Sequence, residues 1–215
     1  MDPFNIAMII ALIISIVLHE MAHGYAANWL GDPTARLQGR LSANPLVHID
    51  PLGSIIIPGL LLFNPLTIMG HHLLFGWAKP VPYNPYNFTN QKWGETIVAA
   101  AGPAANIGIA IIFAILVRSA EVLNLSHTFV ELSINIILLN IFLAFFNLVP
   151  IPPLDGSKIL SRFLPYSLAM RYEHLRLFME RNILISFPII IIVFIFLLSP
   201  LLFVMTSLFA SLLIQ

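Results

Sequence analysis

The 215-residue chain contains no cysteine and few charged residues. The absence of cysteine excludes disulfides, thiolate metal ligands and cysteine nucleophiles, so any metal must be held by His and carboxylate side chains. Charged residues make up 9% of the chain and apolar residues 59%, against about 25% and roughly 45–50% in soluble domains. Lys plus Arg and Asp plus Glu each total 10, a balance that gives no reason to expect a nucleic acid partner. The composition indicates that lipid is the main solvent.

Long apolar runs predict an all-α polytopic membrane protein. Several runs reach the ~20 residues that a helix needs to cross a hydrocarbon layer about 30 Å thick. We expect about five transmembrane helices in a single domain, residues 1–215, with a core near 5–160 and a C-terminal part near 183–214. The clearest predicted spans cover about 5–30, 94–117, 133–149 and 183–214. The last is interrupted at Ser199-Pro200, so its remainder is either an interfacial helix or a further crossing.

The apolar pattern is broken between residues 31 and 93. Residues 34–50 are mixed in character, and we expect short strands or a loop there at the membrane edge. Residues 52–63 and 66–78 are each too short to span comfortably, which predicts either a re-entrant hairpin turning near Asn64-Pro65 or two very short spans. Prolines predict a loop over residues 79–92. Residues 156–182 hold five of the ten Lys and Arg residues, which favours a cytoplasmic location for that segment.

The segment His19-Glu20-Met21-Ala22-His23 places two imidazoles four residues apart on one face of the first predicted helix. Both can therefore reach a single metal ion. Glu20 is suited to accept a proton from water that the ion activates. Ionisable side chains within an apolar helix are costly and usually mark function. The alternative is that the two histidines form hydrogen bonds or bind a pigment at an interface, with Glu20 as their partner.

A catalytic zinc usually has three protein ligands and an open position, so a third ligand must come from elsewhere in the chain. Asp155 is the best candidate, because it follows a proline-rich segment, residues 147–154, that ends a predicted span. Asp-Gly is also a common turn pair, and on its own Asp155-Gly156 would favour a turn. In combination with the two histidines, we interpret Asp155 as a ligand.

Three segments resemble, in type and order, the site-2 protease family of intramembrane metalloproteases. They are HEMAH at 19–23, AGPAAN at 101–106 and NLVPIPPLDG at 147–156. The resemblance covers about residues 6–156, and residues 31–53 are similar to the compact prokaryotic branch, for which no PDZ or CBS domain is expected. The resemblance implies one Zn²⁺ per chain. It also implies that His19, His23 and Asp155 are the zinc ligands, that Glu20 is the catalytic base and that Asn147 lies beside the scissile peptide.

Other polar side chains carry weaker signals. His48, His71 and His72 are either alternative ligands or ordinary loop residues, since they lack the helical spacing of a metal pair. Asn106 and Asn140 are expected to form hydrogen bonds between helices.

The sequence therefore predicts an intramembrane zinc endopeptidase that hydrolyses peptide bonds in or near the transmembrane segments of other proteins. Its expected partners are these substrates and the lipid bilayer, in a prokaryotic cell (inner) membrane. A helical substrate hides its peptide bonds, so the enzyme must hold an extended strand, for which residues 34–46 or 76–81 could supply an edge. The alternative function is a membrane zinc carrier or a non-proteolytic metal-binding scaffold. The ionisable residues gather around one site rather than along a path through several helices, which favours the protease.

Overall fold

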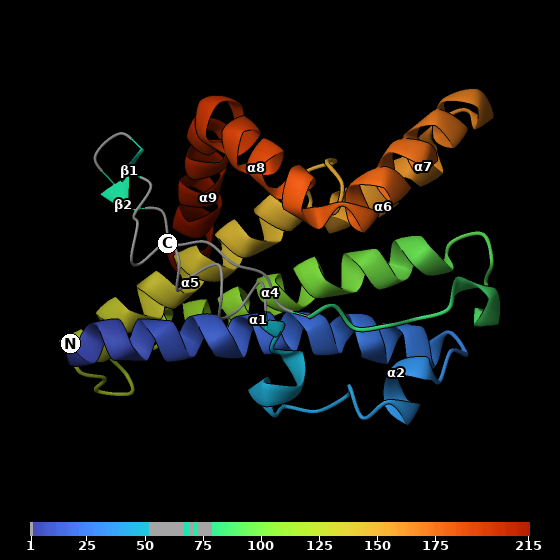
Figure 1. The fold of residues 1–215 in the computed structure, drawn as a ribbon. Helices are drawn as coiled ribbons and strands as arrows, with labels where there is room; N and C mark the ends of the chain where they lie inside the picture. The colour runs from blue at the N-terminus through green and yellow to red at the C-terminus, as the bar shows by residue number, and fades with distance from the viewer. Residues whose placement is uncertain (1, 52–66, 69–70, 73–78) are drawn as a thin grey trace.

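Long helices dominate the computed structural model, which describes residues 2–51, 67–68, 71–72 and 79–215. Helices α1 (Pro3–Trp29), α4 (Gly94–Arg118) and α5 (His127–Asn147) pack against one another. Figure 1 shows α1 and α5 running in the same direction, with α4 opposed to both. This arrangement brings the C-terminal ends of α1 and α5 to one end of the molecule.

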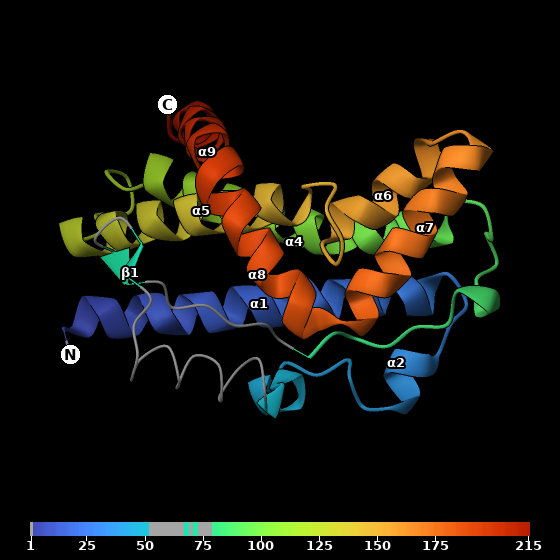
Figure 2. The ribbon, with the colours of Figure 1, turned by 45° about the horizontal axis from the view of Figure 1, so that its top comes forward.

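The last part of the chain is a continuous apolar segment of 32 residues. It consists of α8 (Ile183–Val193), a π-helical turn (Phe194–Leu198) and α9 (Ser199–Ile214). Figures 1 and 2 show that α8 and α9 meet at an angle. This segment and the three helices above are the four helices, within the part of the chain that the structure describes, that are long and apolar enough to cross a membrane.

The helix ends follow from local sequence. The Asp2 carboxylate accepts a hydrogen bond from Phe4 N (3.1 Å) at the start of α1, and Gly31, at φ 102°, follows its end. Helix α5 begins at His127 rather than at the expected Ser133, because the Ser126 hydroxyl accepts from Phe129 N (3.2 Å) and caps an earlier turn.

The short strands expected over residues 34–50 are wrong. The structure has a helical turn there, α2 (Thr34–Leu37), and a 3₁₀ turn at Pro45–His48. Both turns begin at side-chain acceptors, since the Asp32 carboxylate accepts from Thr34 N (3.3 Å) and Asn44 Oδ1 accepts from Leu46 N (3.0 Å). The strands β1 (Thr67–Ile68) and β2 (His71–His72) instead form a two-residue antiparallel pair. The rest of the expected re-entrant hairpin over residues 52–78 lies outside the described residues.

Asp32 ties the end of α1 to the loop that precedes α4, and its side chain is fully buried. Its carboxylate accepts from Asn84 N and from Asn87 Nδ2, each at 2.7 Å, beside the 3₁₀ turn Pro85–Asn87. Thr89 N donates to Leu30 O (2.8 Å) next to this junction. Residues 30–34 and 84–89 therefore lie at the same end of the molecule.

Two further helices pack beside α4. Helix α6 (Asp155–Phe163) packs on α4, and α7 (Tyr166–Arg181) packs on α6. Arg176 of α7 is 7% exposed and donates to Glu95 of α4 (2.8 Å), as well as to Glu173 and Glu180. The Arg176–Glu95 ion pair joins α7 to the start of α4, the helix on which α6 also packs.

Candidate metal centre

Two buried histidines lie on one face of α1, as their four-residue spacing predicts. His19 and His23 are 7% and 8% exposed, and their ring centroids are 4.7 Å apart with nearly perpendicular planes. His23 Nδ1 lies 2.7 Å from Val98 O, and a carbonyl oxygen can only accept, so Nδ1 carries the proton. His19 Nδ1 lies 2.5 Å from Asn106 Oδ1. Each ring thus has its Nδ1 engaged and its Nε2 free to ligate a metal.

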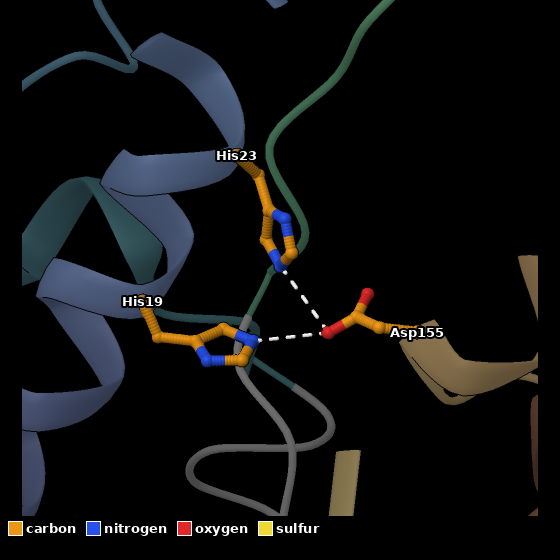
Figure 3. Close-up of side chains that lie close together, drawn as sticks. All are labelled: His19, His23 and Asp155. Atoms are coloured by element: carbon orange, nitrogen blue, oxygen red, sulfur yellow. Dashed lines mark hydrogen bonds and ion pairs between the residues drawn. The ribbon is translucent and has the colours of Figure 1, made fainter. Parts of the chain in front are cut away.

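Asp155 meets these two nitrogens from the other side of the site. It is the first residue of α6, so its carboxylate stands at a helix N-terminus rather than in the isolated turn that Asp-Gly alone favours. One carboxylate oxygen, Oδ2, lies 3.2 Å from His19 Nε2 and 3.3 Å from His23 Nε2 (Figure 3). Gly156 makes this approach feasible, because a Cβ there would collide with the Leu148 carbonyl of the preceding loop.

The electrostatics of the site keep Asp155 ionised. Burial raises the pKa of Asp155, but hydrogen bonding and charge from His19 and His23 outweigh it and hold the pKa well below its usual value. With Nδ1 of both rings engaged, each Nε2 either carries a proton that it donates to Oδ2 or presents a lone pair to it. In the second case a cation must lie between the nitrogens and the carboxylate, so the three side chains are suited to share one.

The three side chains fit a zinc ion in both spacing and shape. Bonds of about 2.0–2.2 Å at tetrahedral angles place two ligand atoms roughly 3.3 Å apart, which matches the separations of both Nε2 atoms from Oδ2. A Cβ added to Gly102 of α4 would lie 2.5 Å from both Nε2 atoms, so glycine at this position lets both rings lie against the helix. Among the described residues, only His19, His23 and Asp155 form a group that could hold a metal.

The other predicted site residues that the structure describes make their contacts outside the cluster of His19, His23 and Asp155. Glu20 Oε2 accepts from Val81 N (3.1 Å), so the carboxylate is held against the segment that follows residue 78. Asn147 is the last residue of α5, and its Nδ2 donates back to Leu143 O (2.9 Å). His48 Nε2 donates to Ser42 O (2.9 Å) and is outside the cluster. The side chains of His71 and His72 lie outside the described part of the chain.

The expected hydrogen bond between helices at Asn106 and Asn140 is confirmed, but sequence reasoning missed the contacts of α4 with the two histidines. Gly102 lets both rings approach the helix, Val98 supplies a carbonyl for His23, and Asn106 contacts His19. The segment AGPAAN, residues 101–106, was the available signal, since Gly102 and Asn106 are four residues apart and share a helix face. None of the proposed ligands lies on α4, so a pattern of metal-binding side chains does not point to this helix.

Comparison with known proteins agrees with this geometry. Residues 120–194, which include Asp155, match the sequence model of peptidase family M50. The candidate zinc metalloprotease YwhC of Bacillus subtilis is 38% identical over 164 residues, which are 74% of this chain and 69% of YwhC. The candidate zinc metalloprotease Rip2 of Mycolicibacterium smegmatis is 29% identical over 157 residues, 73% of this chain and 56% of Rip2. The archaeal candidate MJ0611 of Methanocaldococcus jannaschii is 40% identical over 64 residues, 30% of this chain and 32% of MJ0611. No solved structure matches at a comparable level of significance.

The membrane-length helices and these relatives define the class, an integral membrane metalloprotease that uses zinc. The chain belongs to peptidase family M50, the family of the site-2 proteases, as the resemblance predicted. Membership in a protease family favours hydrolysis over the alternative of a zinc carrier or scaffold.

Proposed function

We propose that this protein is an intramembrane endopeptidase that cleaves peptide bonds in or near the transmembrane segments of other membrane proteins. One observation carries the proposal: two buried Nε2 atoms of α1 lie 3.2 and 3.3 Å from one oxygen of the Asp155 carboxylate, inside a bundle of membrane-length helices. A hydrolytic centre at that position can reach segments that leave or enter the lipid. The prokaryotic relatives support a location in a prokaryotic cell membrane.

In the proposed mechanism, His19, His23 and Asp155 hold the zinc and leave one position open. A zinc ion bound there supplies a Lewis acid that polarises the scissile carbonyl and lowers the pKa of water toward about 7. Glu20 accepts the proton of the attacking water and returns it to the leaving nitrogen, so the proton count balances. Asn147 Nδ2 has a second N–H beyond the one given to Leu143, and this N–H is proposed to stabilise the oxyanion.

Replacement of Glu20 by Gln tests this assignment, because the amide keeps an oxygen that can accept from Val81 N but can no longer take a proton. We expect the Glu20→Gln protein to bind zinc at the wild-type stoichiometry and to lose cleavage. The assay compares membrane proteomes of cells that carry wild-type or variant protein, and zinc is measured in the purified proteins.

Two results would contradict the proposal. Membrane-anchored fragments that persist in the Glu20→Gln cells show that another group is the base, and loss of zinc shows that Glu20 is a ligand. Zinc transport into vesicles that depends on Asp155 but not on Glu20, without any fragment, would instead support a carrier.

A further inference from the structure

A buried hydrogen-bond chain leads from His19 through α4 to α5. His19 Nδ1 lies 2.5 Å from Asn106 Oδ1, and Asn106 Nδ2 donates to Asn140 Oδ1 at 2.9 Å. Asn140 Nδ2 then donates to Ile136 O, also at 2.9 Å, within α5. Both asparagines are fully buried in the centre of the bundle, with 0% exposure. Every polar group in such a buried chain needs a hydrogen-bond partner, so the orientation of each side chain constrains the orientation of the next.

The direction of every bond follows from the carbonyl at the far end. Ile136 O can only accept, so it receives the Asn140 amide N–H and turns Asn140 Oδ1 toward α4. That oxygen also only accepts, and it therefore orients Asn106 with Nδ2 toward α5 and Oδ1 toward His19. Because Asn106 Oδ1 is then an acceptor, His19 Nδ1 must donate an N–H to it. The chain thus selects the His19 tautomer that has its proton on Nδ1 and its lone pair on Nε2.

We propose that Asn106 is a positioning residue of the zinc site, and that Asn140 acts through it by fixing the orientation of its amide. Asn106 holds the His19 ring in the tautomer and rotation that present Nε2 to the ion. Partners of this kind behind a metal-ligating His typically change metal affinity by about 10–100-fold when they are removed. The inference rests on the proposed ligation of zinc by His19.

The same helix orients His23 by a different route, through the Val98 carbonyl. A backbone acceptor cannot be removed by a side-chain substitution, whereas Asn106 can be replaced, so the His19 branch can be tested directly. Gly102 lies between these two acceptors on α4, and its lack of a Cβ lets both Nε2 atoms approach the helix. The face of α4 therefore completes the centre without contributing a ligand.

Four variants distinguish positioning from a simple bridge between helices. Asn106→Leu removes the acceptor, and we expect its zinc affinity to fall about 10–100-fold. Asn106→Asp keeps an acceptor for His19 and should stay within about threefold of wild type, since carboxylate behind a zinc-bound His is a common arrangement. Asn140→Leu cuts the bridge but leaves Asn106 Oδ1 beside His19, and should give a smaller loss than Asn106→Leu. Asn135→Leu on α5, whose amide bonds to Glu131 O of the same helix, is the neutral control.

The readouts are zinc affinity, measured by chelator competition in the purified protein, and the visible absorption spectrum of the Co²⁺-loaded protein. We expect the Co²⁺ spectrum to change in Asn106→Leu and to be restored in Asn106→Asp. Equal losses in Asn106→Leu and Asn140→Leu, or wild-type affinity in Asn106→Leu, would overturn the inference. His19→Ala separates failure of this inference from failure of the proposed function. Unchanged zinc affinity in that variant would show that His19 is not a ligand.

Discussion

At the scale of single residues, the candidate metal centre depends on Gly102, which has no side chain. A Cβ at Gly102 would collide with the Nε2 atoms of both His19 and His23. Gly102→Ala should therefore abolish zinc binding while the three proposed ligands remain in the sequence, because the new methyl group displaces both rings. Zinc content of the purified variant is the measurement. Gly108→Ala on the same helix is the matched control, since a Cβ at Gly108 meets no atom within 4 Å; equal zinc content in both variants would contradict this account.

Asp155 and Asn147 should separate binding from turnover. Asp155→Ala leaves two ligands, so zinc affinity and cleavage are both expected to be lost. Asn147→Ala removes a proposed oxyanion donor, so zinc should stay bound while cleavage slows by about 10²-fold or more. Metal analysis and a cleavage assay on both proteins test the pair. An active Asp155→Ala protein would point to a different third ligand.

Sequence reasoning could find the residues whose type and position in the chain are typical of a metal site. His19 and His23 carry helical spacing, and Asp155 follows a break that prolines make visible. The roles of Gly102 and Asn106 could not be derived in this way, since they depend on how α4 faces α1 and not on any property of α4 alone. Whether the five predicted site residues act as assigned stays a prediction that the variants above test.

At the scale of elements, the junction around Asp32 has a defined dependence on pH. Burial raises the pKa of Asp32, but hydrogen bonds from Thr34, Asn87 and Asn84 outweigh it and lower the pKa below its ordinary value of 3.8. A folded-state pKa below the unfolded one stabilises the protein fully above about pH 3.8. That contribution is lost as the pH falls through the lower, folded value.

We expect the thermal unfolding midpoint of wild type to fall in this acid range, and the difference from Asp32→Asn to shrink with it. Asn is uncharged and isosteric, so it removes the titration and keeps one acceptor oxygen. Unfolding in detergent across pH 2.5–6 measures the difference, and comparing two proteins cancels the other carboxylates. A difference that stays constant over the acid range would show that Asp32 does not titrate as described.

The segment that follows residue 78 shows why edges are hard to predict from sequence. Residues 34–46 or 76–81 are expected to offer a free strand edge, and residues 79–81 belong to no helix or strand. Their backbone groups are nevertheless in use: Lys79 N donates to His48 O, and Arg40 donates to Lys79 O and Pro80 O. Val81 N is taken by Glu20. A substrate strand that pairs there must first displace Arg40 or Glu20, which no pattern in residues 76–81 could indicate.

At the scale of the whole molecule, one set of contacts fixes which parts share a membrane face. Asp32 joins residues 30–34 to residues 84–89, and the ion pair of Arg176 with Glu95 joins α7 to the start of α4. Basic residues are concentrated in α6 and α7, which favours the cytoplasm for this face. Asp2, at the other end of α1, is then expected outside, since 27 helical residues extend about 40 Å.

Single cysteines test this topology in a chain that has none of its own. Leu37 and Tyr86 are 76% and 89% exposed and are good labelling positions, whereas Arg40 is 7% exposed and is not. We expect an impermeant thiol reagent to label a cysteine at Asp2 from outside, and cysteines at Leu37, Tyr86 and Arg171 only after the membrane is opened. Labelling of positions 37 and 86 from opposite sides would contradict the shared face.

The number of spans could be predicted only in part. Four helices that could cross a membrane match predicted apolar runs, because length and hydropathy suffice for long helices. The fifth expected span is not found in the described ranges, and the re-entrant hairpin over residues 52–78 stays a prediction. His48 O and Lys79 N are hydrogen-bonded (2.8 Å), so the chain between them leaves and returns at one place, as such a hairpin requires.

The separation of the ligands along the chain also sets when the enzyme can first work during its own synthesis. His19 precedes Asp155 by 136 positions, an interval that a ribosome covers in roughly 7–27 s at about 5–20 residues per second. Until Asp155 has left the ribosome and docked, the proposed site has its two imidazoles without the Asp155 carboxylate. On the proposed ligand set, we expect the protein to gain its metal and its activity only after the helices from α1 to α5 have been synthesised.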